Sequence, residues 1–422
     1  MWTLLKRISL TQWILIGMGL GTLVGWAWPD FATTLRPLST TFLRMIKSII
    51  VPIIFGTLVI GIAGHGDDMK RVGRLAFRSL LYFEVVTTLA LFIGLLAVNL
   101  VKPGVGVSLP PPAAGSPIPG SGQPTFASVL EHIVPQSFFE AAVSNQVLQI
   151  VFFSVIFAVG LSQVRGRPKE AMLGFCEGLA ETMFKFTAIV MKFAPIGIGA
   201  AIAVTVGHSG LDVLKNLGLL VLTLYGALVV FGLVVLLPVA RLARVPLRPF
   251  LSAVKEPALI AFSTTSSEAA LPKAMERMEA IGVPRRIVAF VMPTGYSFNL
   301  DGSTLYLAVA SVFAAQAAGV HLSLGQQLLM MLTLMVTTKG VAAVPRASLV
   351  ILAGTLASFH LPLEAIAVIL GVDELMDMAR TTVNLVGNCL ATVVMGRWEG
   401  EFDDRKANAY VQQQQPAPPV AA

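Results

Sequence analysis

Polar and charged side chains near the C-terminus interrupt an apolar stretch that extends from Leu361 to Met395. The interrupting sequence, VDELMDMARTTVNLVGN, runs from Val372 to Asn388. Its polar residues recur at steps of three and four, which places them on one face of a helix. These residues are Asp373, Asp377, Arg380, Thr381, Asn384 and Asn388.

Ionised side chains at membrane depth are costly unless they line a cavity or a protein interior. A guanidinium such as that of Arg380 is suited to binding a carboxylate, and the carboxylate of Asp377, one turn away, is suited to an ammonium group. The two residues together predict a site for an acidic amino acid. The alternative is structural, with an Asp377–Arg380 ion pair that fastens the helix to its neighbours.

A second apolar stretch, Ile287–Ala318, is interrupted by the sequence NLDGS at residues 299–303. A helix break there offers an amide, a carboxylate and released backbone carbonyl groups, which are hard oxygen ligands for a small cation. Asn299 and Asp301 are therefore candidate ligands for a sodium ion. The alternative is a glycine kink beside a buried, hydrogen-bonded aspartate.

Two further segments, Phe250–Met278 and Gln326–Ser358, are interrupted by prolines, small residues and hydroxyls. Lysine and arginine residues follow the first segment, so a full crossing would leave them outside, against the positive-inside rule. A hairpin that enters from the cytoplasm and returns is the better prediction. Two interrupted segments in corresponding positions are typical of secondary-transporter sites, where non-helical backbone lines a cavity.

The hairpin tips have compositions that suit ligand binding. The first tip reads STTSSE at residues 263–268, and its hydroxyls and free backbone amides could hold a carboxylate. The second tip, Gly340–Pro345, consists of small residues that let the backbone approach a ligand closely. The alternatives are a serine-rich turn that satisfies its own backbone and simple helix packing.

The composition indicates a polytopic helical membrane protein. The 422 residues are 55% hydrophobic and 13% charged, with a mean hydropathy of +0.78, and apolar runs of about 20 residues are what a bilayer requires. Loop lysines and arginines explain the net charge of +7 better than nucleic-acid binding does. Cys176 and Cys389 lie in apolar runs and are interpreted as packing residues.

Six apolar spans precede the first hairpin. Basic residues cluster before the first span and after the second, fourth and sixth, which predicts that both termini are cytoplasmic. The proline- and glycine-rich segment 102–125 is predicted to be an extended extracellular loop. The predicted spans are Gln12–Trp28, Leu43–Ala63, Leu80–Val101, Phe138–Val164, Met183–Val206 and Leu219–Val239.

Four motifs occur in the order and spacing of one family. The sequence resembles the dicarboxylate/amino acid:cation symporters, which include the excitatory amino acid transporters and archaeal aspartate transporters. The similarity covers nearly the whole chain and is greatest to bacterial proton/glutamate symporters, which share the variants SSE, PTGYSFNLDGSTLY and VGN. The motifs are SSEAALP, NLDGSTLY, TTKGVAAVP and DMARTTVNLVGN.

The resemblance implies an all-α polytopic fold with eight transmembrane helices and two re-entrant helical hairpins. It also implies a homotrimer in which a scaffold stays fixed while an elevator-type transport domain slides in each protomer. The corresponding segments are 1–78 (scaffold spans 1–2), 79–101 (span 3, transport domain), 102–137 (loop), 138–210 (scaffold spans 4–5), 211–249 (span 6), 250–285 (hairpin 1), 286–320 (span 7), 321–360 (hairpin 2), 361–397 (span 8) and 398–422 (cytoplasmic tail).

The resemblance also implies roles for individual residues. Carried over by position, Arg380 would bind the side-chain carboxylate, Asp377 the amino group, and Asn384 the α-carboxylate. The implied substrate-binding residues are Ser266, Ser267, Val344, Asp377, Arg380, Thr381 and Asn384. The implied cation-binding residues are Gly295, Asn299, Asp301, Asn384 and Asn388.

The chain departs from its sodium-coupled relatives at the cation sites. Asn388 stands where they have a carboxylate and Val86 where they have a hydroxyl, so a sodium ion would meet fewer oxygens. Two acids, Glu268 and Glu84, stand where those relatives lack them. Low dielectric and a neighbouring negative charge favour a protonated carboxyl group, so both are predicted proton carriers. The alternative is that either acid stays ionised beside a cation or in a wet vestibule.

These features predict a secondary active symporter of the cell inner membrane, not an enzyme. It would take up L-glutamate or L-aspartate with protons, sodium ions or both by alternating access. The alternative is a C4-dicarboxylate:cation symporter, against which Asp377 argues because a dicarboxylate has no amino group. The expected partners are the substrate, membrane lipid and two further copies of the chain, with no nucleic acid and no cofactor besides the coupling ions.

Overall fold

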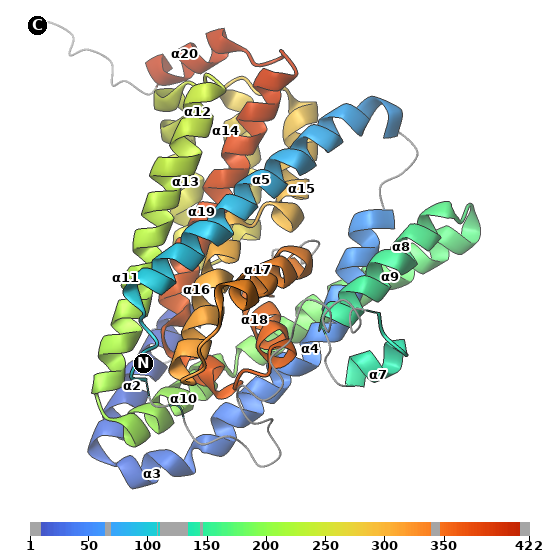
Figure 1. The fold of residues 1–422 in the computed structure, drawn as a ribbon. Helices are drawn as coiled ribbons and strands as arrows, with labels where there is room; N and C mark the ends of the chain where they lie inside the picture. Colours follow the sequence, from blue (N-terminus) through green and yellow to red (C-terminus); the bar gives the residue numbers. More distant parts are fainter. Residues whose placement is uncertain are drawn as a thin grey trace, which may run out of the picture. The chain divides into compact units, whose positions relative to one another are not determined.

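The structure, a computed structural model, describes residues 10–63, 69–107, 109, 134–143, 147–338 and 347–413. This part of the chain consists of helices and their connections and contains no β-strand, so the predicted all-α class is confirmed (Figure 1). Three of its helical stretches are long and apolar enough to cross a membrane: Arg74–Val101, Val213–Leu242 and Arg285–Ala317. A bent pair, Arg167–Met191 with Ala194–His208, adds a fourth if it is one span.

The chain divides into two compact units, each assembled from separate parts of the sequence. The first unit contains the end of α5 (Met69–Val101), most of α11 (Asp212–Phe231) and α16 (Asp301–Ala317), and the beginning of α19 (Glu364–Trp398). Its complete helices are α2 (Leu10–Ala27), α3 (Pro29–Thr34), α4 (Arg36–Ala63), α7 (Phe138–Val143), α8 (Val147–Gln163), α9 (Arg167–Met191), α10 (Ala194–Ser209), α17 (Leu324–Thr338) and α18 (Ala347–Ser358).

The second unit contains the beginning of α5, the first residues of α16 and α19 from Met378 onward. Most of the candidate site residues therefore belong to this unit. Its complete elements are the π-helix η1 (Gly232–Leu236), α12 (Leu237–Leu242), α13 (Leu247–Thr264), α14 (Ser267–Ala280), α15 (Arg285–Phe298) and α20 (Asp404–Gln413).

The fifth predicted span is divided in the structure, and the fourth is described only in part. Residues of the fifth span, Met183–Val206, belong to α9 and α10, which are bent by 53° at the break. Pro195 lies in the first turn of α10, where its missing N–H needs no acceptor, and a proline inside a continuous helix would remove a hydrogen bond. The fourth span, Phe138–Val164, corresponds to α7 and α8, with residues 144–146 outside the described part.

The predicted first hairpin corresponds to α13 and α14, which pack against each other (Figure 1). Their tight turn requires Thr265 to adopt a left-handed conformation with φ of +51°. Ser266 then caps α14, since its hydroxyl accepts a hydrogen bond from the Ala269 backbone N–H at 3.3 Å. The arms of the predicted second hairpin correspond to α17 and α18, and its tip, Gly340–Pro345, lies outside the described residues.

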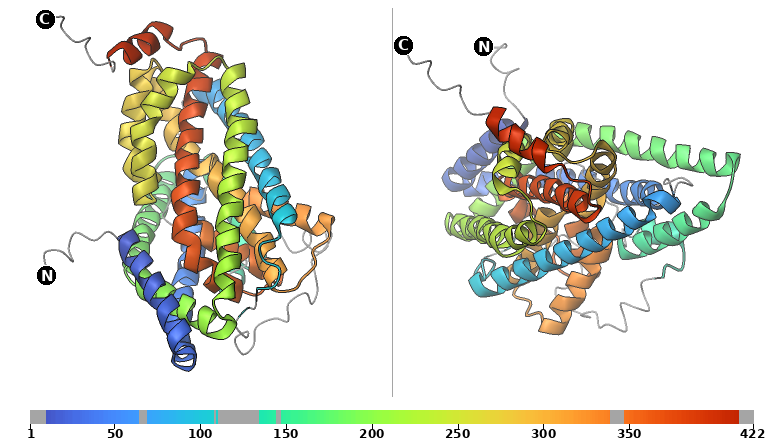
Figure 2. Two further views of the ribbon diagram at one scale, coloured as in Figure 1. Left: turned by 90° about the vertical axis from the view of Figure 1, so that its left-hand side faces the viewer. Right: turned by 90° about the horizontal axis from the view of Figure 1, so that it is seen from above.

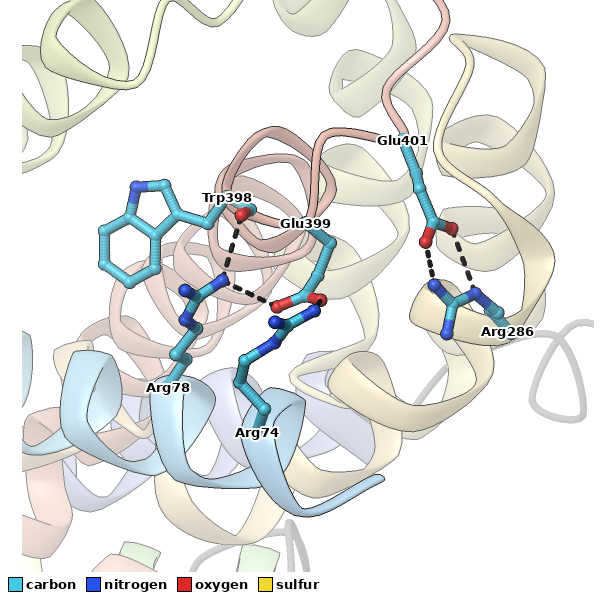
Figure 3. Close-up of polar contacts among 6 residues, drawn as sticks. All are labelled: Arg74, Arg78, Arg286, Trp398, Glu399 and Glu401. Carbon is cyan, nitrogen blue, oxygen red and sulfur yellow. Dashed lines mark hydrogen bonds and ion pairs between the residues drawn. The ribbon is translucent and has the colours of Figure 1, made fainter. Parts of the chain in front are cut away.

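Ion pairs join the ends of three helices within the second unit (Figure 3). Glu399, directly after α19, accepts hydrogen bonds from Arg74 at 3.1 Å and Arg78 at 2.8 Å, both on α5. The Glu399 side chain is only 7% exposed, so this carboxylate is well shielded from water. Arg286 of α15 pairs in the same way with Glu401. These contacts fasten α5 and α15 to the end of the helix that carries most of the site.

The C-terminal helix α20 packs against α13 and α14, and Figure 2 shows it in red beside them. Its Ala407 and Tyr410, three residues apart, are buried. Arg397 fixes the start of α20 through hydrogen bonds of 2.7 and 2.5 Å to the Asp404 carboxylate. This hydrogen bonding holds the pKa of the Asp404 carboxyl below its usual range, against a smaller opposing effect of partial burial.

Candidate functional site

The break between α15 and α16 lies against α19 within the second unit. Asn299 ends α15, with its backbone N–H donating to the Gly295 carbonyl at 2.7 Å, and α16 begins at Asp301. Two glycines permit the close approach, because a Cβ at Gly295 would overlap the Asn388 side chain and one at Gly387 would overlap the Asp301 carboxylate. The NLDGS and VGN motifs, far apart in the sequence, are therefore in direct contact.

Asn299, Asp301 and Asn388 form a polar cluster in which each residue is 0% exposed. The Asn299 Nδ2 donates to Asn388 Oδ1 at 3.1 Å and to Asp301 Oδ2 at 3.3 Å. Asn299 Oδ1 and Asn388 Nδ2 have no hydrogen-bond partner among the described residues. A buried carbonyl oxygen without a donor, beside a carboxylate, is a suitable ligand for a small cation. The Asn388 nitrogen is a donor and cannot serve in this way.

Asn384 caps α16 from a neighbouring helix. Its Oδ1 accepts hydrogen bonds from the backbone N–H groups of Gly302 at 2.8 Å and Ser303 at 3.2 Å, and its Nδ2 donates to Ser303 Oγ at 2.9 Å. The first N–H groups of a helix have no acceptor within it, so this amide satisfies two that would be orphaned. The resemblance implied only ligand-binding roles for Asn384, and nothing in the sequence pattern pointed to the capping role.

Arg380 and Thr381 lie on α19 with exposed fractions of 1% and 6%, and Asp377, one turn earlier, is 4% exposed. Among the described residues, Arg380 has the largest fully buried side chain. A Cβ at Gly302 would overlap the Arg380 backbone carbonyl, so the first turn of α16 packs closely here as well. The charged face expected from the spacing of three and four is therefore an interior face.

The first hairpin tip is tied to α15, since the Tyr296 hydroxyl donates to the Ser267 carbonyl at 3.1 Å. Ser267 is 5% exposed and Ser266 is half-buried. Glu268 is the second residue of α14, and its side chain is outside what the structure describes. Val344, the predicted contributor from the second hairpin, also lies outside the described residues.

The α5 segment before Leu91 contributes to the same unit. Glu84 is half-buried, and the hydroxyls of Thr87 and Thr88 donate to backbone carbonyls of α5, that of Thr88 to the Glu84 carbonyl at 2.6 Å. Tyr82, which the sequence pattern did not single out, is buried and interacts electrostatically with Asp301. Its hydroxyl has no hydrogen-bond partner within the described ranges. Tyr82 is therefore a neighbour of the polar cluster formed by Asn299, Asp301 and Asn388.

The ligand types at this cluster are amide oxygens and one carboxylate, which suit hard cations more than transition metals. In the part of the chain that the structure describes, no three or more histidine, cysteine, aspartate and glutamate side chains are grouped as a metal site. Cys176 and Cys389 are buried free thiols. Their burial is consistent with the interpretation that both are packing residues.

Comparison with known proteins covers almost the whole chain. Residues 10–398 match the sequence profile of the sodium:dicarboxylate symporter family. The chain is 45% identical over 423 residues to the proton/sodium-glutamate symport protein of Bacillus subtilis, with 97% of each chain covered. It is 42% identical over 424 residues to the proton/glutamate-aspartate symporter of Escherichia coli, with 96% of each covered. It is also 41% identical over 404 residues to a Bacillus subtilis C4-dicarboxylate transport protein, covering 94% of this chain and 96% of the relative.

Proposed function

The chain belongs to the sodium:dicarboxylate symporter family, and we propose on this basis that it takes up L-glutamate and L-aspartate by secondary active symport. The observation that carries the proposal is the identity of 42–45% to glutamate symporters over nearly the full length of both chains. The fully buried Arg380 supports it, because a guanidinium held away from water favours a substrate that brings a carboxylate.

The proposed substrate site is centred on α19. Arg380, with Thr381, binds the side-chain carboxylate, which distinguishes acidic from neutral amino acids. Asp377, one turn earlier, binds the ammonium group, and Asn384 takes the α-carboxylate while it also caps α16. Two hairpin tips complete the proposed site, with Ser266 and Ser267 from the first and Val344 from the second.

The proposed coupling ions are protons, sodium ions or both, consistent with the names of the relatives. The buried cluster of Asn299 and Asp301, with Gly295 and the oxygens of Asn384 and Asn388 nearby, is the proposed cation site. Glu268 and Glu84 are the proposed proton carriers. No group beyond these ions is required for the transport cycle.

The proposed architecture is that of a multi-pass inner-membrane protein with eight spans, two re-entrant hairpins and cytoplasmic termini. Spans 1, 2, 4 and 5 form the proposed scaffold of a homotrimer. Spans 3, 6, 7 and 8 and both hairpins form the proposed transport domain, which slides between the two faces of the membrane.

Counterflow into proteoliposomes tests the proposal without any assumption about the driving ion. Vesicles loaded with unlabelled L-glutamate should take up labelled L-glutamate, and external L-aspartate should inhibit while L-leucine should not. Protein-free vesicles are the control. Vesicles that contain the protein and show no exchange above this control would contradict the proposal.

The C4-dicarboxylate relative makes dicarboxylate transport the second candidate. Succinate carries two carboxylates but no ammonium group. A variant of Asp377, the proposed ammonium ligand, therefore distinguishes glutamate transport from dicarboxylate transport. In the glutamate account, Asp377→Asn weakens inhibition by L-glutamate far more than inhibition by succinate. Equal losses for both ligands would assign Asp377 a structural role and favour the dicarboxylate.

A further inference from the structure

The outer face of α13 combines an apolar stripe with one lysine. Leu251, Lys255, Leu259 and Phe262 are spaced by four, four and three residues, which places them on one helix face. Leu251 and Leu259 are 64% and 60% exposed, Phe262 is 38% exposed, and Lys255 is exposed as well. An exposed apolar stripe in a membrane transporter suits lipid, and the ammonium of a lysine within it must reach the polar interface or meet an anion.

A hollow of about 490 Å³ lies beside this stripe, entirely within the second unit. Lys255, Leu259 and Glu256 of α13 line it, together with Arg277 of α14 and Tyr410 of α20. Its volume lies in the range of small-ligand pockets. The hollow therefore has one wall from each arm of the first hairpin and one from the docked C-terminal helix.

The charges around the hollow leave a positive excess. Arg277 pairs with Glu256 at 2.6 Å, and Lys273 pairs with Glu276 at 3.0 Å and approaches Glu256 at 3.9 Å. Both carboxylates are thus engaged by other cations, and within the described residues no carboxylate pairs with Lys255. Three cations against two carboxylates leave one positive charge, which an anionic ligand would neutralise.

The depth of Lys255 favours a lipid headgroup as that ligand. Lys255 lies eight residues after Leu247, the first residue of α13, or about 12 Å along the helix axis. Arg244 and Arg248 flank the start of α13 and, in the topology of the proposed function, mark the cytoplasmic surface. A lysine at this depth can extend its ammonium to the phosphate layer while its stem lies on hydrocarbon.

We propose that the hollow beside Lys255 binds the headgroup of an anionic phospholipid. The Lys255 ammonium contacts the phosphate and Arg277 lies behind it. Leu259 and Phe262, which lie farther from the cytoplasmic end of α13 than Lys255, contact the acyl chains. The side chain of Tyr410, which is 7% exposed, closes the side formed by α20. This inference rests on the membrane topology of the proposed function, but it concerns lipid binding and does not depend on the transported substrate.

Lipid titration of the delipidated, full-length protein in detergent tests this proposal by native mass spectrometry. Phosphatidylglycerol should be retained more strongly than zwitterionic phosphatidylcholine. Lys255→Gln should weaken phosphatidylglycerol binding about fivefold, equivalent to roughly 1 kcal/mol for one lysine near an anionic headgroup. Lys255→Arg should bind like the unmodified protein. Lys406→Gln, which removes an exposed charge from α20 outside the hollow, is the matched control and should change nothing.

Three results would overturn the lipid assignment. Equal retention of the two lipids would show that the net negative charge of the lipid does not contribute to binding. Equal losses of phosphatidylglycerol binding in Lys255→Gln and Lys406→Gln would indicate non-specific attraction of anionic lipid to basic residues. Displacement of phosphatidylglycerol by millimolar inorganic phosphate would assign the hollow to free phosphate. Glutamate counterflow by the same protein reconstituted into proteoliposomes reports on the proposed function separately, so a failure of one is distinguishable from a failure of the other.

Discussion

At the scale of single residues, burial determines what Arg380 can do. A guanidinium with 1% exposure has lost its hydration, so its interactions with nearby charged and polar groups are strong. A guanidinium can bind a substrate carboxylate through two parallel hydrogen bonds. A lysine ammonium carries the same charge but does not offer this geometry. This difference explains why an arginine, rather than a lysine, suits the position that selects acidic substrates.

Replacing Arg380 by cysteine should therefore abolish selective binding of L-glutamate. Truncating one partner of a buried charge pair costs about 2–5 kcal/mol, which is roughly tens to thousands of fold in affinity. Equilibrium binding of labelled glutamate measures the loss, with Arg405→Cys, which removes an exposed charge from α20, as the control. Unchanged glutamate affinity in Arg380→Cys would refute the assignment.

Gly387 tests the contact between α19 and the cation cluster. Alanine at this position would push a methyl group against the Asp301 carboxylate, so Gly387→Ala should lower thermal stability by about 1–3 kcal/mol and reduce uptake. Gly396 is on the same helix, but a Cβ there meets nothing closer than Val283 Cγ1 at 3.5 Å. Gly396→Ala should be neutral or slightly stabilising, since alanine is the better helix former. Similar thermal shifts in both variants would show that the contact is not specific.

At the scale of helices, the features that could be predicted from the sequence are those that depend on hydropathy and on the spacing of nearby residues. The charged face of α19, the break at Asn299 and a hairpin turn within residues 263–268 were predicted from intramembrane polar residues, prolines and serines, which act on the nearby backbone. The capping of α16 by Asn384 was not predicted, because it depends on a contact between two helices whose bonded residues, Gly302 and Asn384, are 82 positions apart in the sequence. The involvement of Tyr82 and the docking of α20 likewise depend on tertiary contacts that leave no periodic signal.

The docking of α20 should depend on pH through Asp404. Its carboxyl pKa is lowered in the folded state by Arg397, so the contribution of the pair is fully present above the unfolded value near 4 and is lost as pH falls through the folded value. The protection of α20 amides, measured as the exchange rate relative to the intrinsic rate at each pH, should therefore fall on acidification. Asp404→Asn lacks the charge at every pH and should show fast exchange in α20 already at neutral pH. An exchange rate identical to that of the unmodified protein at neutral pH would contradict this role.

At the scale of the whole molecule, the composition of the cation cluster bears on which ion drives the proposed uptake. The cation cluster keeps the Asp301 carboxylate and the Asn299 carbonyl oxygen, but Asn388 presents a nitrogen donor without a hydrogen-bond partner among the described residues. A sodium ion at this position therefore meets fewer oxygens than a carboxylate would provide. Protons carried by an acid at the first hairpin tip would supply the missing coupling, with sodium as an accessory ion.

The most direct test is concentrative uptake of labelled L-glutamate into proteoliposomes under an inward proton gradient without sodium. With proton coupling, we expect accumulation above the external concentration. Glu268→Gln should abolish this accumulation but retain glutamate exchange. Glu276→Gln, which changes an exposed acid on the same helix, should behave like the unmodified protein. Uptake by the unmodified protein that requires sodium and is indifferent to the proton gradient would contradict the central claim.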